Sequence, residues 1–371
     1  MLFEQTTLGD VSKGGKGNYG IAASAVDYSD ELYTYLRITD IKDDGTIDFG
    51  GLKSVNDGKA ANYLLQPNDI VFARTGASTG RNYFYDGSDG QFVYAGFLIK
   101  FSIDPDKVNP KYVKYYCLSQ EYKGWIASYN TGSTRGNINA QTLAQMPLLL
   151  PERMQQDKMV DILSSIDRKI KENEKINKNL KQQAQAIYSR MFIEHRQESW
   201  STGQLSDLIS VKYGKDHKKL ADGNFPVYGS GGIMRYVEKP LYTGESVLIP
   251  RKGTLNNVMY VNEAFWSVDT MFYTEMLRPN IAKFVYHFVK SKDLTSLNAG
   301  SAVPSMTTNI LNAMQLYIPD EKTLEKFENI VSPMYSAMQE NTKGSKILAN
   351  TRDTLLPKLI SGELDVSGID L

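Results

Sequence analysis

An internal repeat at a constant offset of 168 residues constrains the fold of this chain more than any other feature. Residues 130–192 align with residues 298–360 without a gap. The matching pairs are Asn130/Asn298, Gly132/Gly300, Ser133/Ser301, Leu143/Leu311, Met146/Met314, Leu148/Leu316, Pro151/Pro319, Ile162/Ile330, Ser164/Ser332, Glu172/Glu340, Asn173/Asn341, Lys175/Lys343, Lys178/Lys346 and Leu180/Leu348. So many matches at one fixed offset indicate a duplicated structural unit.

A weaker similarity extends the repeat upstream of each copy. The segment NDIVFARTG (68–76) is similar to GESVLIPRKG (244–253), so that Arg74 and Gly76 fall on Arg251 and Gly253. Further upstream, LGDV (8–11) is similar to LSDL (205–208). The sequence therefore predicts two globular domains, each followed by a segment that begins at a proline, with the four parts at residues 1–150, 151–198, 199–318 and 319–371.

The two globular domains are predicted to be of the α+β class. Short runs rich in β-branched and aromatic residues, separated by glycine and asparagine, are typical of strands. These runs are 33–41, 69–76, 92–101, 246–253 and 257–261. Residues 109–128 and 280–294 instead show apolar residues at helical spacing.

The segments after Pro151 and Pro319 carry apolar residues at alternating steps of three and four, which is the heptad pattern of a coiled coil. In the first segment the seam consists of Met159, Leu163, Ile166, Ile170, Asn173, Asn177, Leu180, Ala184, Ile187 and Met191. In the second it consists of Phe327, Val331, Met334, Met338, Asn341, Ser345, Leu348, Arg352, Leu355 and Leu359. We expect two long helices that pair as an antiparallel coiled coil, with Pro333 kinking or breaking the second one.

Composition restricts the environment of the chain and the strength of any DNA binding. No stretch reaches the roughly 18 uninterrupted apolar residues of a membrane span, and the first residues do not resemble a signal peptide. With Cys117 as the only cysteine, no internal disulfide is possible, so we expect a cytoplasmic protein. The formal net charge is zero, and even residues 199–318 carry only 12 basic against 9 acidic residues. If the chain binds DNA, a partner must supply much of the affinity for the phosphate backbone.

The sequence lacks the motifs of the enzymes that act on DNA. NPKY (109–112) lacks the second proline of the motif of amino-methyltransferases, and there is no phosphate-binding loop. The three histidines show no metal-ligand spacing. Pro105-Asp106 with Glu121-Tyr122-Lys123 fits a loose nuclease pattern, but its second half falls in a predicted helix instead of a strand. We therefore expect neither a catalytic site nor a bound metal or cofactor.

An ordered set of segments resembles the specificity subunits of type I restriction–modification enzymes. VYGSGGI (227–233), VLIPRKGTLNNV (247–258) and FWSVDTMFY (265–273) resemble a target-recognition domain of that family. NDIVFARTGASTG (68–80) is similar to the matching element of the first domain. The stretch that begins NTGSTRGNINAQ (130–141) resembles a domain end, and LLPKLISGELDV (355–366) resembles the C-terminal tail.

The resemblance covers nearly the whole chain and implies that its globular domains and its long helices have different roles. Each of two target-recognition domains would read one half of a split target in double-stranded DNA, with an unread spacer between the halves. The two long helices would set the distance between the domains. Two methyltransferase subunits would dock on this scaffold, and restriction subunits would join through the complex.

Polar loops in both domains supply candidate DNA contacts. A guanidinium suits guanine or phosphate, and an asparagine amide suits adenine. In the first domain the candidates are Arg74, Thr75, Ser78, Arg81, Asn82, Arg135 and Asn137, with Lys13, Lys16, Asn18 and Tyr19 as a further polar loop. In the second domain they are Tyr228, Ser230, Arg251, Lys252, Asn256 and Asn257, beside Gly229, Gly231 and Gly232.

Other interpretations of these residues and of the chain remain open. Glycine-rich loops also make tight turns that asparagines cap, without any ligand. Trp200 and Trp266 are expected to belong to the core instead of stacking on bases. The chain as a whole could instead be a scaffold or an inhibitory protein that lacks sequence-specific DNA binding, or the specificity subunit of a related system that cuts on one or both sides of its site.

Overall fold

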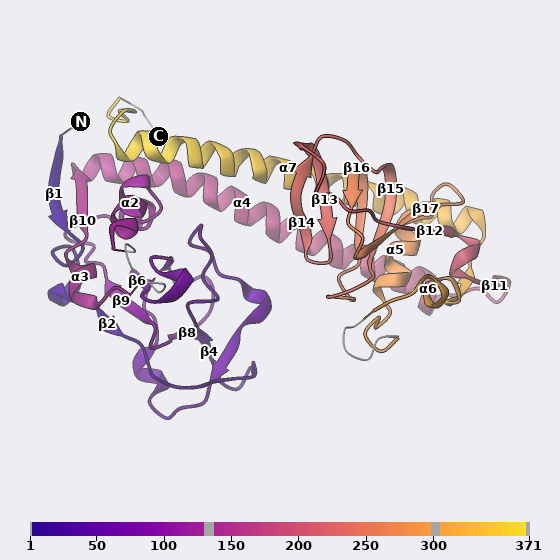
Figure 1. Ribbon diagram of the computed structural model, residues 1–371, viewed down its shortest axis with the longest axis horizontal. Helices are drawn as coiled ribbons and strands as arrows, with labels where there is room; N and C mark the ends of the chain where they lie inside the picture. Colours follow the sequence, from indigo (N-terminus) through magenta and orange to yellow (C-terminus); the bar gives the residue numbers. More distant parts are fainter. Residues whose placement is uncertain (1, 130–136, 298–304, 369–371) are drawn as a thin grey trace. The chain divides into compact units, whose positions relative to one another are not determined.

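The computed structural model describes residues 2–129, 137–297 and 305–368. The chain divides into two compact units. Unit 1 consists of Met1–Glu172 together with Gly344–Leu371, and unit 2 consists of Asn173–Lys343. Both units combine helices with strands, in agreement with the predicted α+β class (Figure 1). No helix in the described ranges combines the length and the apolar character that crossing a bilayer requires.

Unit 1 contains two four-stranded sheets and a two-stranded one. The first has the order β2 (Asn18–Tyr19), β9 (Leu98–Ser102), β6 (Asp69–Ala73), β7 (Asn82–Tyr85). The second has the order β3 (Ala25–Val26), β5 (Lys53–Val55), β4 (Tyr33–Leu36), β8 (Phe92–Tyr94). β1 (Phe3–Thr7) pairs antiparallel with β10 (Pro147–Pro151). Three helices complete the domain: α1 (Pro110–Tyr116), α2 (Gln120–Ser128) and α3 (Ala140–Ala144).

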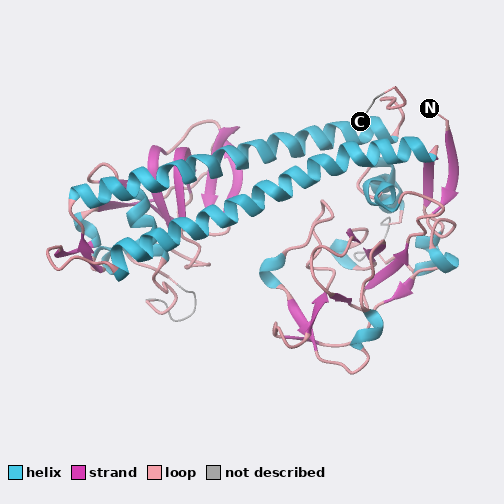
Figure 2. Ribbon diagram, turned by 180° about the vertical axis from the view of Figure 1, so that it is seen from behind, coloured by secondary structure: helices cyan, strands magenta, loops and turns pink. Residues whose placement is uncertain are grey.

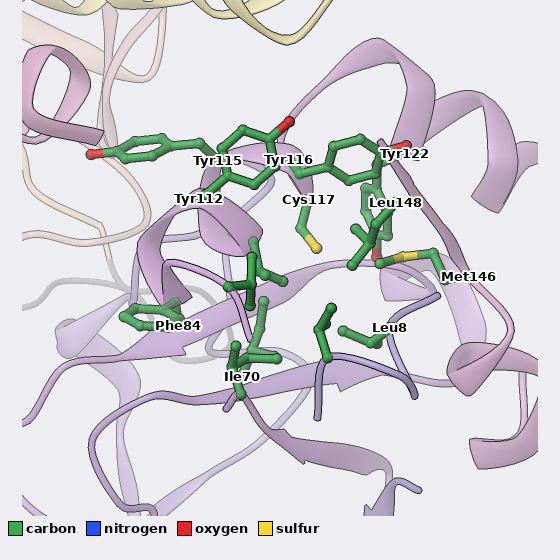
Figure 3. Packing of buried hydrophobic residues seen from close by; sticks show 14 of the residues in the cluster. Leu8, Ile70, Phe84, Tyr112, Tyr115, Tyr116, Cys117, Tyr122, Met146 and Leu148 are labelled. Carbon is green, nitrogen blue, oxygen red and sulfur yellow. The ribbon is translucent and has the colours of Figure 1, made fainter. Parts of the chain in front are cut away.

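The main core of unit 1 lies between the β2-β9-β6-β7 sheet and the helices α1 and α2. Tyr112, Tyr115, Tyr116, Cys117 and Tyr122 pack there against residues from the strands and from the edges of the domain, which include Leu8, Ile70, Phe84, Met146 and Leu148 (Figure 3). Met159 and Leu163 of the following long helix and Leu359 near the C-terminus belong to the same cluster. The main core of unit 1 is therefore built from residues that lie far apart in the sequence.

Unit 2 is built around a single six-stranded sheet. Its order is β12 (Ile209–Tyr213), β17 (Met271–Met276), β15 (Tyr242–Pro250), β16 (Met259–Ser267), β13 (Asp222–Gly229), β14 (Gly232–Val237). β11 (Ser201–Gln204) pairs antiparallel with β18 (Gln315–Ile318), and the helices are α5 (Ala282–Lys290) and α6 (Thr308–Asn312). Trp200 and Trp266 are both buried in this unit, as predicted.

The sequence repeat is reproduced in the short helices that precede the long ones. α3 and α6 occupy equivalent positions at the offset of 168, and both begin at a capping side chain that accepts a hydrogen bond from a backbone N–H. Asn139 accepts from Thr142 at 2.8 Å, and Thr307 accepts from the equivalent Ile310 at 3.3 Å. Such caps satisfy backbone donors that the first turn of a helix leaves without a partner.

The two longest helices are α4 (Arg153–Tyr188) and α7 (Glu321–Ile360), of 36 and 40 residues (Figure 2). Burial along both helices follows the predicted seam, whose positions are buried or half-buried. α4 ends before the predicted boundary at residue 198, because Ser189–Glu194 form a wider π-helical turn.

The sequence predicts a kink or a break at Pro333. The break is wrong, because α7 continues through this position without interruption. A proline inside a helix removes one hydrogen bond and crowds the preceding turn, at a cost of about 3 kcal/mol. Pro333 itself is exposed, whereas Phe327 and Val331 are buried in the core of unit 2 and Met334 packs against it. This packing holds the helix on both sides of the proline.

In each unit a buried or half-buried charged group joins the globular part to the long helices. In unit 1, Asp167 of α4 accepts hydrogen bonds from Lys114 (2.8 Å) and Tyr115 (2.8 Å) of α1 and from Arg352 of α7 (3.0 Å). Burial raises the pKa of Asp167, but the charge of Lys114 and these hydrogen bonds outweigh it and leave the pKa below its usual value. In unit 2, Lys283 of α5 contacts Glu328 of α7 at 2.6 Å and Glu245 of β15 at 2.8 Å.

Candidate nucleic-acid interface

The predicted loops around Arg74 and Arg251 leave equivalent strands in the two units. In unit 1 the strand order β2-β9-β6 places Tyr19 opposite Ile99 and Ala73 opposite Leu98. In unit 2 the order β12-β17-β15 places Tyr213 opposite Phe272 and Pro250 opposite Met271. Each arginine is the first residue after its strand.

The backbone holds both arginines in the same way. The N–H of Arg74 donates to the carbonyl of Phe97 at 3.1 Å, and its own carbonyl accepts from the N–H of Ile138 at 2.9 Å. The N–H of Arg251 donates to the carbonyl of Thr270 at 2.8 Å, and its carbonyl accepts from the N–H of Met306 at 2.9 Å. Ile138 and Met306 are themselves equivalent in the repeat, so the duplication that the sequence predicted extends to these loops.

Both guanidinium groups lie over a tyrosine ring. The Cζ atom of Arg74 is 5.2 Å from the ring centre of Tyr19, and that of Arg251 is 5.5 Å from the ring centre of Tyr213. Arg74 Nη1 also donates to Asn137 Oδ1 at 3.4 Å, and Arg251 Nη1 donates to the carbonyl of Asp269 at 3.1 Å. Within the described ranges neither arginine forms an ion pair, so both loops present positive charge that no carboxylate neutralises.

Arg81 and Asn82 have partners within unit 1. Arg81 donates from Nε and Nη2 to the two carboxylate oxygens of Asp43, at 2.6 and 3.2 Å. Asn82 is buried, and its amide donates to the carbonyl of Cys117 at 2.9 Å and to that of Gly80 at 3.5 Å. In the free chain these two side chains brace the loop that carries Arg74.

The remaining candidates of unit 1 surround this loop. Thr75 forms an isolated antiparallel bridge with Asn137, which is exposed. Ser78 ends a short 3-10 turn, Gly76–Ser78, and its carbonyl accepts from the N–H of Arg81 at 2.9 Å. Gly76 has a φ of +72°, a conformation that favours glycine. Arg135 lies outside the described residues.

In unit 2 the loop after Arg251 packs against the turn between β13 and β14. Asn257 donates from its amide to the carbonyl of Ser230 at 2.8 Å, which ties the two segments together. Gly253 has a φ of +85°, and a Cβ there would lie 2.9 Å from Ser230 Oγ. Lys252 is exposed and bridges Ser305 through its backbone, as Thr75 bridges Asn137 in unit 1.

Asn256 and Tyr228 have internal partners in unit 2. Asn256 donates to Asp293 Oδ1 at 3.1 Å and accepts from the N–H of Leu294 at 2.8 Å. The buried hydroxyl of Tyr228 donates to Glu263 at 2.6 Å, and burial, with this hydrogen bond, raises the pKa of Tyr228 far above its usual value. Both residues fix the segments that present Ser230, Arg251 and Lys252.

Sequence reasoning missed Tyr213, although a signal was present. Tyr19-Gly20 recurs as Tyr213-Gly214 at the same position of the equivalent strand. The glycine is required in both copies, because a Cβ at Gly20 would lie 2.2 Å from the carbonyl oxygen of Ala95 and one at Gly214 would lie 2.0 Å from that of Val268. A dipeptide is too short to stand out without the register of the sheet.

The loose nuclease pattern, the histidines and Cys117 are the remaining candidates for chemistry. Glu121 and Lys123 lie on α2, as expected, and not on a strand. His287 is buried between Gln185 (2.8 Å) and Tyr335 (2.9 Å), and no group of His, Cys, Asp and Glu in the described ranges is arranged to hold a metal ion. Burial raises the pKa of the Cys117 thiol, which makes it a poor nucleophile.

A family model described as the type I restriction modification DNA specificity domain matches residues 2–182 and 197–348. The chain belongs to this family. The specificity domain is a non-catalytic recognition module, so the chain is a DNA-recognition subunit and not an enzyme. The resemblance that the sequence indicated is thereby confirmed.

Named relatives and a solved structure agree with this family. The chain is 20% identical over 307 residues to the type I restriction enzyme MjaIX specificity subunit of Methanocaldococcus jannaschii, and the match covers 71% of each chain. It is 26% identical over 281 residues to a putative type I specificity subunit of Mycoplasma pneumoniae, covering 69% of this chain and 74% of that one. The crystal structure of the S subunit of a type I restriction-modification system from M. genitalium matches 96% of both chains with a TM-score of 0.59 and 18% identity, which shows a shared fold.

Proposed function

We propose that this chain reads a DNA target in two separate parts for a type I restriction–modification enzyme. The globular parts at residues 1–150 and 199–318 are the two target-recognition domains, and each reads one half-site through the major groove. The segments at 151–198 and 319–371 are the spacers between them. The base pairs between the half-sites are left unread.

One observation carries this proposal, namely that the Arg74 and Arg251 loops have the same construction in both units. Each arginine follows an equivalent strand, is held by an equivalent pair of backbone hydrogen bonds, and has no acidic partner among the described residues. A guanidinium on the surface without a carboxylate partner is available for the N7 and O6 acceptors of guanine or for a phosphate. Two such groups, one in each unit, suit a target with two halves.

The same geometry divides the other candidate residues into two roles. Thr75, Ser78, Asn137, Ser230 and Lys252 lie beside the arginines and would contact the bases or phosphates of their half-site, as would Arg135. Arg81, Asn82, Tyr228 and Asn256 are held by internal partners and would shape the loops, while Asn257 joins the two segments of unit 2. Phosphate contacts then position each domain, and base contacts specify the sequence.

We further propose that α4 and α7 form an antiparallel coiled coil that sets the distance between the domains. Contacts within each unit support this arrangement. In unit 1, Asp167 of α4 meets Arg352 of α7 at 3.0 Å, and in unit 2, Asn177 of α4 meets Asn341 of α7 at 2.9 Å. Residue numbers rise along one helix while they fall along the other, as antiparallel pairing requires.

The partners follow from the duplication and from the charge. Because each recognition domain is followed by its own copy of the spacer segment, the chain offers two equivalent places where methyltransferase subunits can dock, one for each half-site. Restriction subunits would join through this complex. With a net charge of zero, the chain alone provides little attraction for the phosphate backbone, so the methyltransferase subunits would supply much of it.

The test is sequence-dependent DNA binding by the chain with and without its methyltransferase subunit. We expect the purified chain to neither bind S-adenosylmethionine nor methylate DNA. The complex should methylate a defined motif with two conserved halves, found by sequencing modified bases in cells with and without the chain. Methylation by the chain alone would contradict the recognition role. Unchanged DNA selectivity on adding the chain to the methyltransferase would favour an inhibitory scaffold instead.

A further inference from the structure

We propose that Tyr19 and Tyr213 are positioning residues that orient Arg74 and Arg251 for base reading, so that each half-site is read by an arginine held on a tyrosine ring. This inference rests on the proposed function, in which the arginines contact the two half-sites. It adds one specificity-determining residue to each domain. Neither tyrosine needs to touch a base itself.

The two tyrosines occupy one position of the duplicated sheet. Each lies at the end of an edge strand, β2 or β12, and the neighbouring strand, β9 or β17, separates it from the strand that leads to the arginine. The glycine that follows each tyrosine fits against a carbonyl too closely for any side chain. A tyrosine ring therefore lies beside an arginine guanidinium at the equivalent position of both domains, although the surrounding loops differ in sequence.

Each ring is fixed by a contact other than the arginine. The hydroxyl of Tyr19 accepts a hydrogen bond from the N–H of Ala140, the first residue of α3, at 3.1 Å. The ring of Tyr213 meets the edge of Phe272, with ring centres 5.1 Å apart and an interplanar angle of 69°. Both side chains are nevertheless 45% and 51% exposed, so the fold holds two large aromatic rings at the surface instead of burying them.

A fixed ring restricts an arginine in a way that favours base reading. The attraction between a cation and a ring face restricts the orientation of the guanidinium. At Arg74 the ring of Phe97 also lies 5.9 Å from Cζ, and Nε is buried, so the Nη groups are the ones that can reach a base. Bidentate recognition of guanine needs two of those N–H groups in one plane, so an arginine that is already oriented loses less rotamer freedom on binding. The hydrogen bonds of Arg74 to Asn137 and of Arg251 to Asp269 engage one nitrogen, Nη1, in each case.

The test is a double-mutant cycle in the complex of the full chain with its methyltransferase subunit. Methylation rates are measured on duplexes that carry the recognised site, and on duplexes with single base-pair changes in one or the other half. Tyr213→Leu should reduce discrimination at one guanine of one half-site by about two- to fivefold, the range of an exposed cation–π contact. Tyr19→Leu should do the same for the other half. Tyr213→Phe, which keeps the ring, should restore discrimination.

The cycle separates positioning from other roles. In an Arg251→Ala background, Tyr213→Leu should cause no further loss, since the arginine that it orients is gone. A loss that persists in that background would show direct stacking on DNA or a structural role and would overturn the inference. The matched control is Tyr317→Leu, because Tyr317 on β18 lies under Arg196 at 4.0 Å in the same kind of contact, outside the recognition loops.

Failure of the inference can be told from failure of the proposed function. If Arg251→Ala has no effect, or affects both half-sites equally, the assignment of the arginines is wrong and the proposed function loses its support. If Arg251→Ala affects one half-site while Tyr213→Leu resembles the unmodified chain, only the role of the tyrosine is wrong. Melting temperatures of all variants are measured to show that unit 2 stays folded.

Discussion

The side-chain amide of Asn173 donates a hydrogen bond to the carbonyl oxygen of Asn341 at 3.4 Å, and the two residues are 168 positions apart. That separation equals the offset of the sequence repeat, so equivalent residues of the two copies touch each other. Asn341 in turn donates to Asn177 Oδ1 at 2.9 Å, and Asn173 is buried.

Replacing both asparagines by leucine, Asn173→Leu with Asn341→Leu, should raise stability and reduce fidelity. A polar residue in a heptad seam specifies register at a cost in stability. We expect the midpoint of thermal unfolding to rise by about 2–4 °C, as for a gain of roughly 1 kcal/mol. The methylated sites should then show a broader range of spacer lengths. Asn179→Leu, at an exposed position of α4, is the control. A lower midpoint with an unchanged spacer would show that the pair stabilises the seam without setting its register.

His287 should make the stability of unit 2 depend on pH between about 4 and 6.5. Burial, with a smaller contribution from the charge of Lys181, lowers the pKa of His287 from 6.5 to about 4. The unfolded chain therefore binds a proton in this interval that the folded chain does not. The contribution of His287 to stability is present in full above pH 6.5 and is lost as the pH falls toward 4. The total effect is about 2–4 kcal/mol.

The measurement is the free energy of unfolding at several pH values for the chain and for His287→Gln. We expect the variant to lose most of the slope between pH 4 and 6.5. The exposed His195, replaced by glutamine, serves as the control and should leave the slope unchanged. An identical slope in the chain and in His287→Gln would mean that other groups titrate in this interval.

How far the sequence predicts this structure depends on the range of the interactions involved. The seams of α4 and α7, and the equivalence of α3 with α6, follow from local periodicity and from the repeat. The continuity of α7 at Pro333 could not be predicted, because it depends on packing around Phe327 and Val331. At the candidate site, the repeat identified Arg74 and Arg251. The pairing of Arg81 with Asp43, and of Asn82 with Cys117, joins residues more than thirty positions apart and leaves no local pattern.

Lengthening both long helices by one heptad should lengthen the unread spacer. Seven residues inserted within 166–180 of α4 and within 334–348 of α7 keep the seam in phase and add about 10 Å at roughly 1.5 Å per residue. At about 3.4 Å per base pair, the spacer should grow by up to about three base pairs. Rotation of the second half-site around the duplex reduces the gain.

Sequencing of methylated sites measures the spacer of this variant. The half-sites should stay the same, because no recognition loop is altered. An insertion in α4 alone is the control, and it should shift the seam of α4 relative to that of α7 and reduce activity. Full activity with the original spacer would mean that the helices do not set the distance, and altered half-sites would mean that the recognition domains are assigned to the wrong residues.

The most direct test of the account is the methylated motif of Arg74→Ala compared with that of Arg251→Ala. Each change should relax the sequence requirement in one half-site only, a different half for each variant, with a loss of about 1–3 kcal/mol if the arginine contacts a base through two hydrogen bonds. Lys42→Ala and Lys239→Ala, which remove an exposed charge from unit 1 and unit 2, are the controls. An equal loss on all DNA would show that the arginine contacts only phosphate. Relaxation of both halves by one arginine variant would contradict the claim that each unit reads its own half of the target.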